Sequence, residues 1–121
     1  MDNLEILRAK HALKKAEGLK KESVNRLPGL IVSNGLLATL AFVCEEKPER
    51  EPLKIAMDAV AEYLSKRNIL KDIKENNNAA KEMLHQLITK GSSLDLQQAT
   101  YETLKYLAYL KRFSEKKSSS S

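Results

Sequence analysis

Few side chains in this 121-residue chain could take part in catalysis. The sequence holds two histidines, His11 and His85, and one cysteine, Cys44, so a Cys–His pair can be drawn on paper. Cys44 ends an apolar run, however, where a thiol is usually an unreactive core residue. Glu82-x-x-His85 matches half of a di-iron helix pattern, but the chain has no second copy, and a solvated helix face explains it better. We therefore predict no enzyme activity, no metal site and no cofactor.

The positive charge gathers at the two ends of the chain. Residues 1–26 hold seven Lys or Arg against four acids, residues 101–121 hold five against two, and the middle holds nine against ten. If the first and last helices are neighbours, their charges merge into one basic surface that attracts a polyanion. The alternative is two solvated faces with a modest bias of sign. The candidate residues for binding phosphates of such a polyanion are Lys10, Lys14, Lys21, Lys105, Lys111 and Arg112.

An aromatic stripe runs through the basic C-terminal segment. Tyr106, Tyr109 and Phe113 follow helical spacing among lysines and an arginine, an arrangement that can hold single-stranded nucleic acid. Core packing with the tyrosine hydroxyls at its rim explains the same spacing, and we favour it.

The composition is typical of a small globular protein. Charged residues make up 31% of the chain, and four Gly with three Pro leave few turn residues for an all-β fold. A single cysteine excludes an intrachain disulfide and suits a reducing compartment. Asp2 and Glu5 lie where an export signal would be basic and then apolar. These features predict a cytoplasmic protein.

Apolar residues recur at helical spacing over 3–24, which predicts an amphipathic first helix. The residues expected on its core side are Ile6, Ala9, Leu13, Ala16 and Leu19.

The apolar run from Leu27 to Cys44 admits three interpretations. Asn34-Gly35 is ordinarily a hairpin signal, but its flanks lack polar alternation and no other strand exists to extend a sheet. The run has the minimum length for a membrane span, yet polar residues dilute it. We predict a buried central helix over 27–44, with Pro28 in its first turn.

The rest of the chain is predicted to be helical. Pro52 opens one helix, and residues 69–90 form another, in which Asn76-Asn77-Asn78 gives even odds of a break. Ser92-x-x-Asp95 fits a capping box that starts the last helix, which runs to about Lys117. The fold class is thus all-α: a compact bundle of about five helices in a single domain over 1–117, followed by a disordered Ser tail at 118–121.

Two stretches carry a resemblance to a known family. The run from Leu27 to Phe42, LPGLIVSNGLLATLAF, combines a proline, an aliphatic turn, Asn-Gly-Leu and then Thr-Leu-Ala-Phe. The last helix adds a Leu-Lys-Arg-Phe ending at 110–113. Both resemble the small helical subunit of the Cmr complex, the type III-B CRISPR RNA-targeting effector, and the resemblance extends over essentially the whole chain.

The resemblance implies a non-catalytic assembly subunit in antiviral defence. Copies of such a subunit stack beside the backbone subunits, near the large subunit, and help to line a channel for guide RNA and target RNA. Its partners would be those subunits, other copies of itself and the two RNAs, with no membrane. A helical protein-protein adaptor without a nucleic-acid role is the alternative.

We expect a structural role for the motif residues of the resemblance. In this interpretation Gly35 lets two helices approach closely, and Asn34 satisfies a buried polar partner. The motif residues are Pro28, Asn34, Gly35, Thr39 and Phe42.

Overall fold

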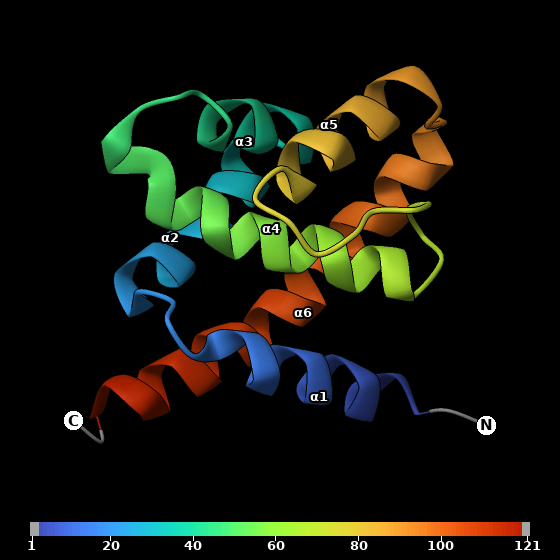
Figure 1. Cartoon of the computed structure of the whole chain (residues 1–121). Coiled ribbons are helices and arrows are strands. Elements are labelled where there is room, and N and C mark those ends of the chain that lie inside the picture. The colour runs from blue at the N-terminus through green and yellow to red at the C-terminus, as the bar shows by residue number, and fades with distance from the viewer. Residues whose placement is uncertain (1–2, 120–121) are drawn as a thin grey trace.

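The computed structural model describes residues 3–119, and within this range it contains helices and no strand (Figure 1). The all-α prediction is confirmed, with six α-helices in the described range instead of five. They are α1 (Leu4–Ala16), α2 (Lys21–Asn34), α3 (Leu36–Val43), α4 (Glu51–Lys66), α5 (Ala79–Thr89) and α6 (Ser93–Ser119), with a short 3-10 turn at Pro48–Arg50 before α4. The single domain over 1–117 and the disordered tail at 118–121 stay predictions, and residues 120–121 lie outside the described residues.

Three helices begin at side chains that satisfy free backbone N–H groups. The Asn3 side chain accepts from the backbone N–H groups of Glu5 and Ile6, at 2.8 and 3.2 Å. Ser92 and Asp95 form the predicted capping box at the start of α6. The start of α5 is instead capped from α4, because Asp58 accepts from the N–H of Ala80 at 2.8 Å.

The central helix of the fold is α4, which contacts all five other helices (Figure 1). Nine of its sixteen residues are buried, so it is surrounded on nearly every side. The prediction of a buried central helix over 27–44 was therefore wrong. That stretch lies at the periphery, and Val32 and Asn34 are exposed there.

Gly35 divides the predicted 27–44 helix into α2 and α3. Its φ of +92° and ψ of 158° lie in a region that only glycine adopts readily. The two roles expected at this point were also wrong, because no atom approaches within 4 Å of a Cβ at Gly35 and Asn34 is exposed. The chain turns between two helices here, and Thr39 steadies the turn by donating to the Gly35 carbonyl at 2.9 Å.

The other two motif residues have local roles. Pro28 lies inside α2, half-buried, and does not begin a helix as expected. Phe42 lies under the guanidinium of Arg50, whose carbon is 3.9 Å from the ring centroid, and its carbonyl accepts from Arg50 at 3.3 Å. Phe42 thus ties the end of α3 to the segment that leads into α4.

The first predicted helix, 3–24, ends early and presents a different face. Gly18, with φ of +87°, lies between α1 and α2. Ile6 and Leu13 were expected in the core, but they are 57% and 53% exposed. Ala16 is buried as expected, but His11 and Ala12 are buried with it, because α1 turns a polar stripe toward its neighbours.

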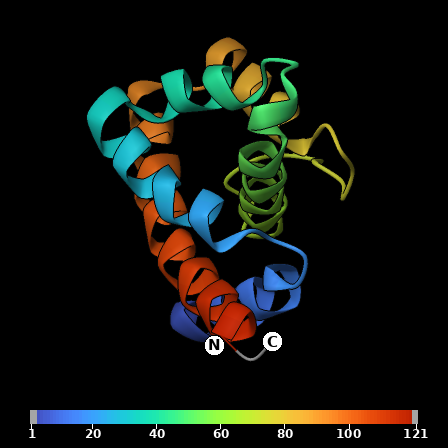
Figure 2. The ribbon, with the colours of Figure 1, turned by 90° about the vertical axis from the view of Figure 1, so that its left-hand side faces the viewer.

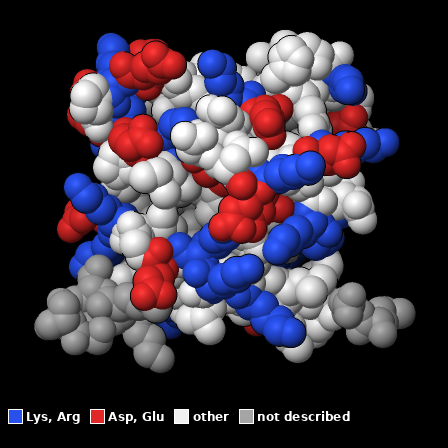
Figure 3. Space-filling model, in the orientation of Figure 1, with Lys and Arg blue, Asp and Glu red and all other residues white. Residues whose placement is uncertain are grey.

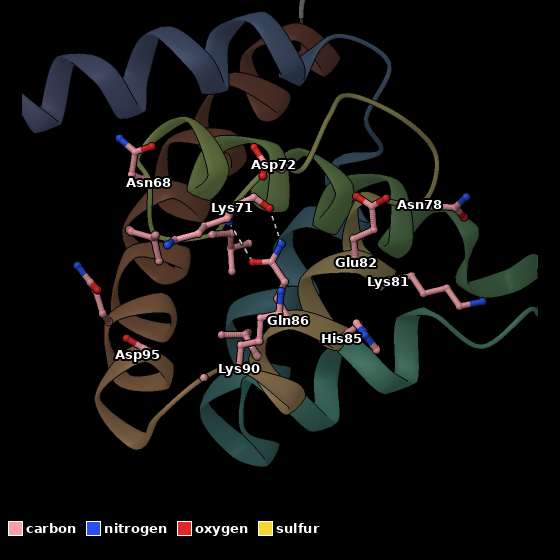
Figure 4. Close-up of a pocket in the computed structure, with 15 residues that line it drawn as sticks. Asn68, Lys71, Asp72, Asn78, Lys81, Glu82, His85, Gln86, Lys90 and Asp95 are labelled. Carbon is pink, nitrogen blue, oxygen red and sulfur yellow. Dashed lines mark hydrogen bonds between the residues drawn. The ribbon is translucent and has the colours of Figure 1, made fainter.

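The predicted helix 69–90 is shorter than expected. Residues 67–78 are irregular, and α5 begins directly after Asn76-Asn77-Asn78. The irregular segment is fastened to α5 where the Gln86 side chain pairs with the backbone N–H and carbonyl of Lys71 (Figure 4). The sequence analysis left even odds of a helix break at the Asn triplet, and the structure contains this break.

The first and last helices are neighbours, as the merging of their charges required. In both views α1 lies across the C-terminal part of α6, and α2 runs along α6 (Figures 1 and 2). This packing places the two basic ends of the sequence on one part of the molecule.

The backbone geometry at Gly35 predicts a position-specific loss of stability. Gly35→Ala should lower the free energy of unfolding by about 1–3 kcal/mol, because alanine is strained at this φ and ψ. Gly29 is the matched control: it lies within α2 with open space at its Cβ position, so Gly29→Ala should stabilise by about 0.5–1 kcal/mol. Urea unfolding of both variants measures the difference, and equal effects of the two changes would contradict this role.

Candidate nucleic-acid interface

Two buried carboxylates lie where α1, α4 and α6 meet. Glu62 on α4 and Glu102 on α6 are each only 5% exposed. A buried carboxylate costs several kcal/mol unless cations and hydrogen-bond donors compensate for the lost water. The helices around these two groups supply such partners.

Glu102 is held by two arginines and a tyrosine. Arg8 donates from Nε and Nη2 to the two carboxylate oxygens, at 3.1 and 2.5 Å. Arg67 donates to Oε2 at 3.2 Å, and the Tyr63 hydroxyl donates to the same oxygen at 3.3 Å. Burial opposes ionisation of Glu102, but Arg8, Arg67 and Tyr63 together outweigh it, so the pKa of Glu102 lies below its ordinary value.

Glu62 takes its partners mainly from α1. Lys15 lies 2.7 Å from Oε2, and Nε2 of His11 lies 3.4 Å from Oε1. The Lys66 ammonium is 3.8 Å away on the next turn of α4. Lys15 also pairs with Glu75 at 2.8 Å, which ties the irregular segment to α1. Each of the two carboxylates therefore joins α1 to another helix.

His11 is a buried, neutral link in this network. Glu62 can only accept a hydrogen bond, so Nε2 of His11 carries the proton and Nδ1 accepts from the Tyr106 hydroxyl at 2.6 Å. Burial lowers the pKa of His11 despite the neighbouring Glu62. Tyr106 in turn stacks on Tyr63, with ring centroids 4.5 Å apart and planes 9° apart.

A basic groove lies above this junction, between α1 and α4. Four cationic side chains line the groove, which has a volume of about 260 Å³, and its lining includes no Asp or Glu. Lys and Arg gather on this face of the molecule, over α1 and the end of α4 (Figure 3). The residues that line it, called the basic groove below, are Leu7, Lys10, His11, Lys14, Tyr63, Lys66 and Arg67.

The structure brings together part of the predicted phosphate-binding set. Lys10 and Lys14 are exposed and line the basic groove. Lys105, Lys111 and Arg112 are exposed on α6 but do not line it, and Lys21 is half-buried in the first turn of α2. The packing of α1 against α6 therefore does not by itself unite all six side chains.

The sequence analysis missed two of the groove cations, Lys66 at the end of α4 and Arg67 directly after it. They belong to the middle of the chain, whose net charge is slightly negative, so partitioning the charge along the sequence hid them. Their adjacency at the end of the helix that begins near Pro52 was the available signal. Only the antiparallel packing of α1 against α4 sets them opposite Lys10 and Lys14 (Figure 1).

The aromatic stripe on α6 packs against the core, which is the interpretation favoured from the sequence. Tyr106 is fully buried, and Tyr109 and Phe113 pack partly buried against the core, with ring centroids 6.3 Å apart. These three rings therefore help to fix α6 in the bundle.

One comparison with known proteins identifies the family of the chain. A family model described as CRISPR-associated protein (Cas_Cmr5) matches residues 4–117, which is nearly the whole chain. The chain belongs to the Cas_Cmr5 family. Comparisons with curated proteins and with solved structures gave no match. The resemblance drawn from the Leu27–Phe42 motif is confirmed, and this Cas_Cmr5 chain is a small subunit of the Cmr complex of a type III-B CRISPR system.

The remaining chemically active side chains of this Cas_Cmr5 chain lie apart from the groove. Cys44 is half-buried, and burial raises the pKa of its thiol. Glu82 and His85 are exposed, as expected, and border an open hollow between α5, the start of α6 and the irregular segment (Figure 4). Among the side chains that the structure describes, no three His, Cys, Asp or Glu are grouped so that they could hold a metal ion.

None of the helices in the described part of the Cas_Cmr5 chain is long and apolar enough to cross a membrane.

The His11 environment predicts a pH dependence of stability. The pKa of His11 is lower in the folded state than the ordinary value of about 6.5, so between these two values the unfolded chain binds more protons. Stability should therefore fall as the pH is lowered from about 7.5 through 6.5. Thermal unfolding between pH 7.5 and 5.5 measures this slope, which His11→Gln should flatten. His85→Gln alters the exposed histidine and should leave the slope as it is; equal flattening by both changes would refute the assignment.

The junction also predicts a large cost for neutralising Glu102. Glu102→Gln leaves Arg8 and Arg67 without their buried counter-charge and should destabilise by about 3–5 kcal/mol. Glu82→Gln makes the same chemical change at an exposed position and should stay within about 0.5 kcal/mol of the parent. Urea unfolding compares the two variants, and a Glu102→Gln protein as stable as the control would show that the pair contributes no net stability.

Proposed function

We propose that this subunit holds RNA in the Cmr effector complex by its backbone phosphates and does not cleave it. Membership of the Cas_Cmr5 family supports a place for the chain in the Cmr complex, and the basic groove supports the binding of RNA. The function belongs to antiviral RNA silencing in the cytoplasm.

The absence of acidic residues among the groove lining carries the proposal. Lys10 and Lys14 on α1 converge with Lys66 at the end of α4 and with Arg67, which directly follows that helix. Glu62 and Glu102 are buried below them and already paired. The groove lining would offer a phosphate three lysines and an arginine that also holds Glu102, and no Asp or Glu. Contacts of this kind give affinity without reading bases, as suits a subunit whose complex finds its target by base pairing to a guide.

The proposed partners are guide RNA and target RNA, the backbone and large subunits, and neighbouring copies of the chain. Lys21, Lys105, Lys111 and Arg112 remain part of the proposed RNA surface, as phosphate-binding residues outside the groove. Their exposure, complete or partial, leaves them accessible to phosphates or to an acidic partner.

The state of the candidate catalytic groups supports a non-catalytic role. His11 is committed to Glu62 and Tyr106 in the buried junction, and its depressed pKa keeps it neutral. The thiol of Cys44 has a raised pKa, which disfavours the nucleophilic thiolate. Both groups therefore act in packing in this proposal.

Removing the groove lysines tests the function. A Lys10→Gln, Lys14→Gln double variant should bind a fluorescent single-stranded RNA more weakly, to a similar degree for unrelated sequences. The slope of log K against log salt should shrink by about 0.7 for each phosphate that the variant no longer neutralises. Fluorescence anisotropy over a series of salt concentrations measures both.

The matched control is a Lys81→Gln, Lys90→Gln double variant, which removes the same charge outside the groove. It should retain most of the affinity and a steeper slope than the groove variant. If both variants lose the same affinity, net charge alone drives binding and the groove is not the site. If the parent chain joins the other Cmr subunits after thorough nuclease treatment and binds no RNA, the chain acts as a protein-protein adaptor.

A further inference from the structure

Tyr101 is an aromatic side chain that the packing of α6 leaves in solvent. It is 58% exposed, whereas Tyr63 and Tyr106 are buried, Tyr109 and Phe113 pack against the core, and Phe42 lies under Arg50. All six aromatic residues of the chain are among these, so Tyr101 alone presents most of its ring to solvent. The Tyr101 side chain is not part of the hydrophobic core.

The ring of Tyr101 is accompanied by a cation. The Lys105 ammonium lies over the ring, 5.3 Å from its centroid, one helical turn further along α6. An exposed aromatic face beside a lysine combines the two elements that bind a nucleotide in single-stranded nucleic acid: a surface for the base and a charge for the phosphate.

Tyr101 also lies next to a residue of the buried junction under the basic groove. It precedes Glu102, whose carboxylate holds Arg8 and Arg67, and Arg67 lines the groove. Tyr101 is near enough to Arg8 to contribute to the raised pKa of that guanidinium. Tyr101 is thus linked, through Glu102 and Arg8, to the junction beneath the basic groove.

We propose that Tyr101 stacks on one unpaired base of an RNA strand whose phosphates lie in the basic groove, with Lys105 binding the adjacent phosphate. The proposal rests on the proposed function and deepens it, because it names the form of nucleic acid that the surface prefers. A base in a duplex has both faces stacked already, whereas an unpaired base has a face free for the ring. The surface would thus favour single-stranded RNA over duplex RNA, with tolerance of any base.

The test separates stacking from phosphate binding by the choice of probe. Three fluorescent oligomers of equal length are compared at one salt concentration: a single-stranded oligouridine, the same ribose-phosphate chain with abasic sites in place of the uracils, and an RNA duplex. Tyr101→Ala should weaken binding of oligouridine by about 5- to 150-fold, the range for removal of one stacked base. Its effect on the abasic strand and the duplex should be less than about twofold, because neither probe offers the ring an unpaired base.

Two variants control for other causes. Tyr101→Phe keeps the ring and should retain the affinity for oligouridine. Val32→Ala truncates another exposed side chain, on α2, and should bind all three probes as the parent does.

Each outcome decides between the two proposals. Equal weakening of oligouridine and abasic strand by Tyr101→Ala, or no weakening of either, overturns the stacking of a base. If the Lys10→Gln, Lys14→Gln variant binds RNA as tightly as the parent, the basic groove is not the phosphate-binding site. The result for Tyr101→Ala is then judged independently of the groove. A parent chain that binds none of the three probes overturns both.

Discussion

The burial of Glu62 and Glu102 is the constraint on which the rest of the structure depends. A carboxylate without water must be surrounded by cations and donors, and each of these two takes partners from more than one helix. Arg8 joins α1 to α6, Lys15 joins α1 to α4, and Arg67 joins the C-terminal cap of α4 to α6. The relative placement of these three helices is thus fixed by charge pairing as well as by apolar packing.

The same pairing decides which cations are available for a ligand. Arg8, His11 and Lys15 follow one another at i, i+3 and i+7 on the inner side of α1, where they are used up in the junction. Lys10 and Lys14 are rotated away from that stripe and line the groove. A helix with one basic stripe inside and another beside it can therefore hold the fold together and still present positive charge.

Many local features of the fold could be predicted from the sequence because their causes are local. The capping box needs only Ser92 and Asp95, three positions apart in the sequence. The helix break before Ala79 likewise depends on the three asparagines directly before it. The helix break at Gly35 was not predicted. Asn34-Gly35 between apolar flanks was interpreted either as a hairpin turn or as part of one continuous helix. The positive φ of Gly35 offers a third arrangement, two helices joined by one residue.

The sequence by itself determined the helical class, the family through its Leu27–Phe42 motif and the concentration of charge at the two ends. Only the tertiary structure decided which charges are paired. Ile6 and Leu13 gave α1 an apolar face in the sequence, yet they point to solvent because the buried carboxylates draw Arg8, His11 and Lys15 inward. A lysine in a buried pair and a lysine in a groove are identical letters, and the difference arises only when distant helices meet.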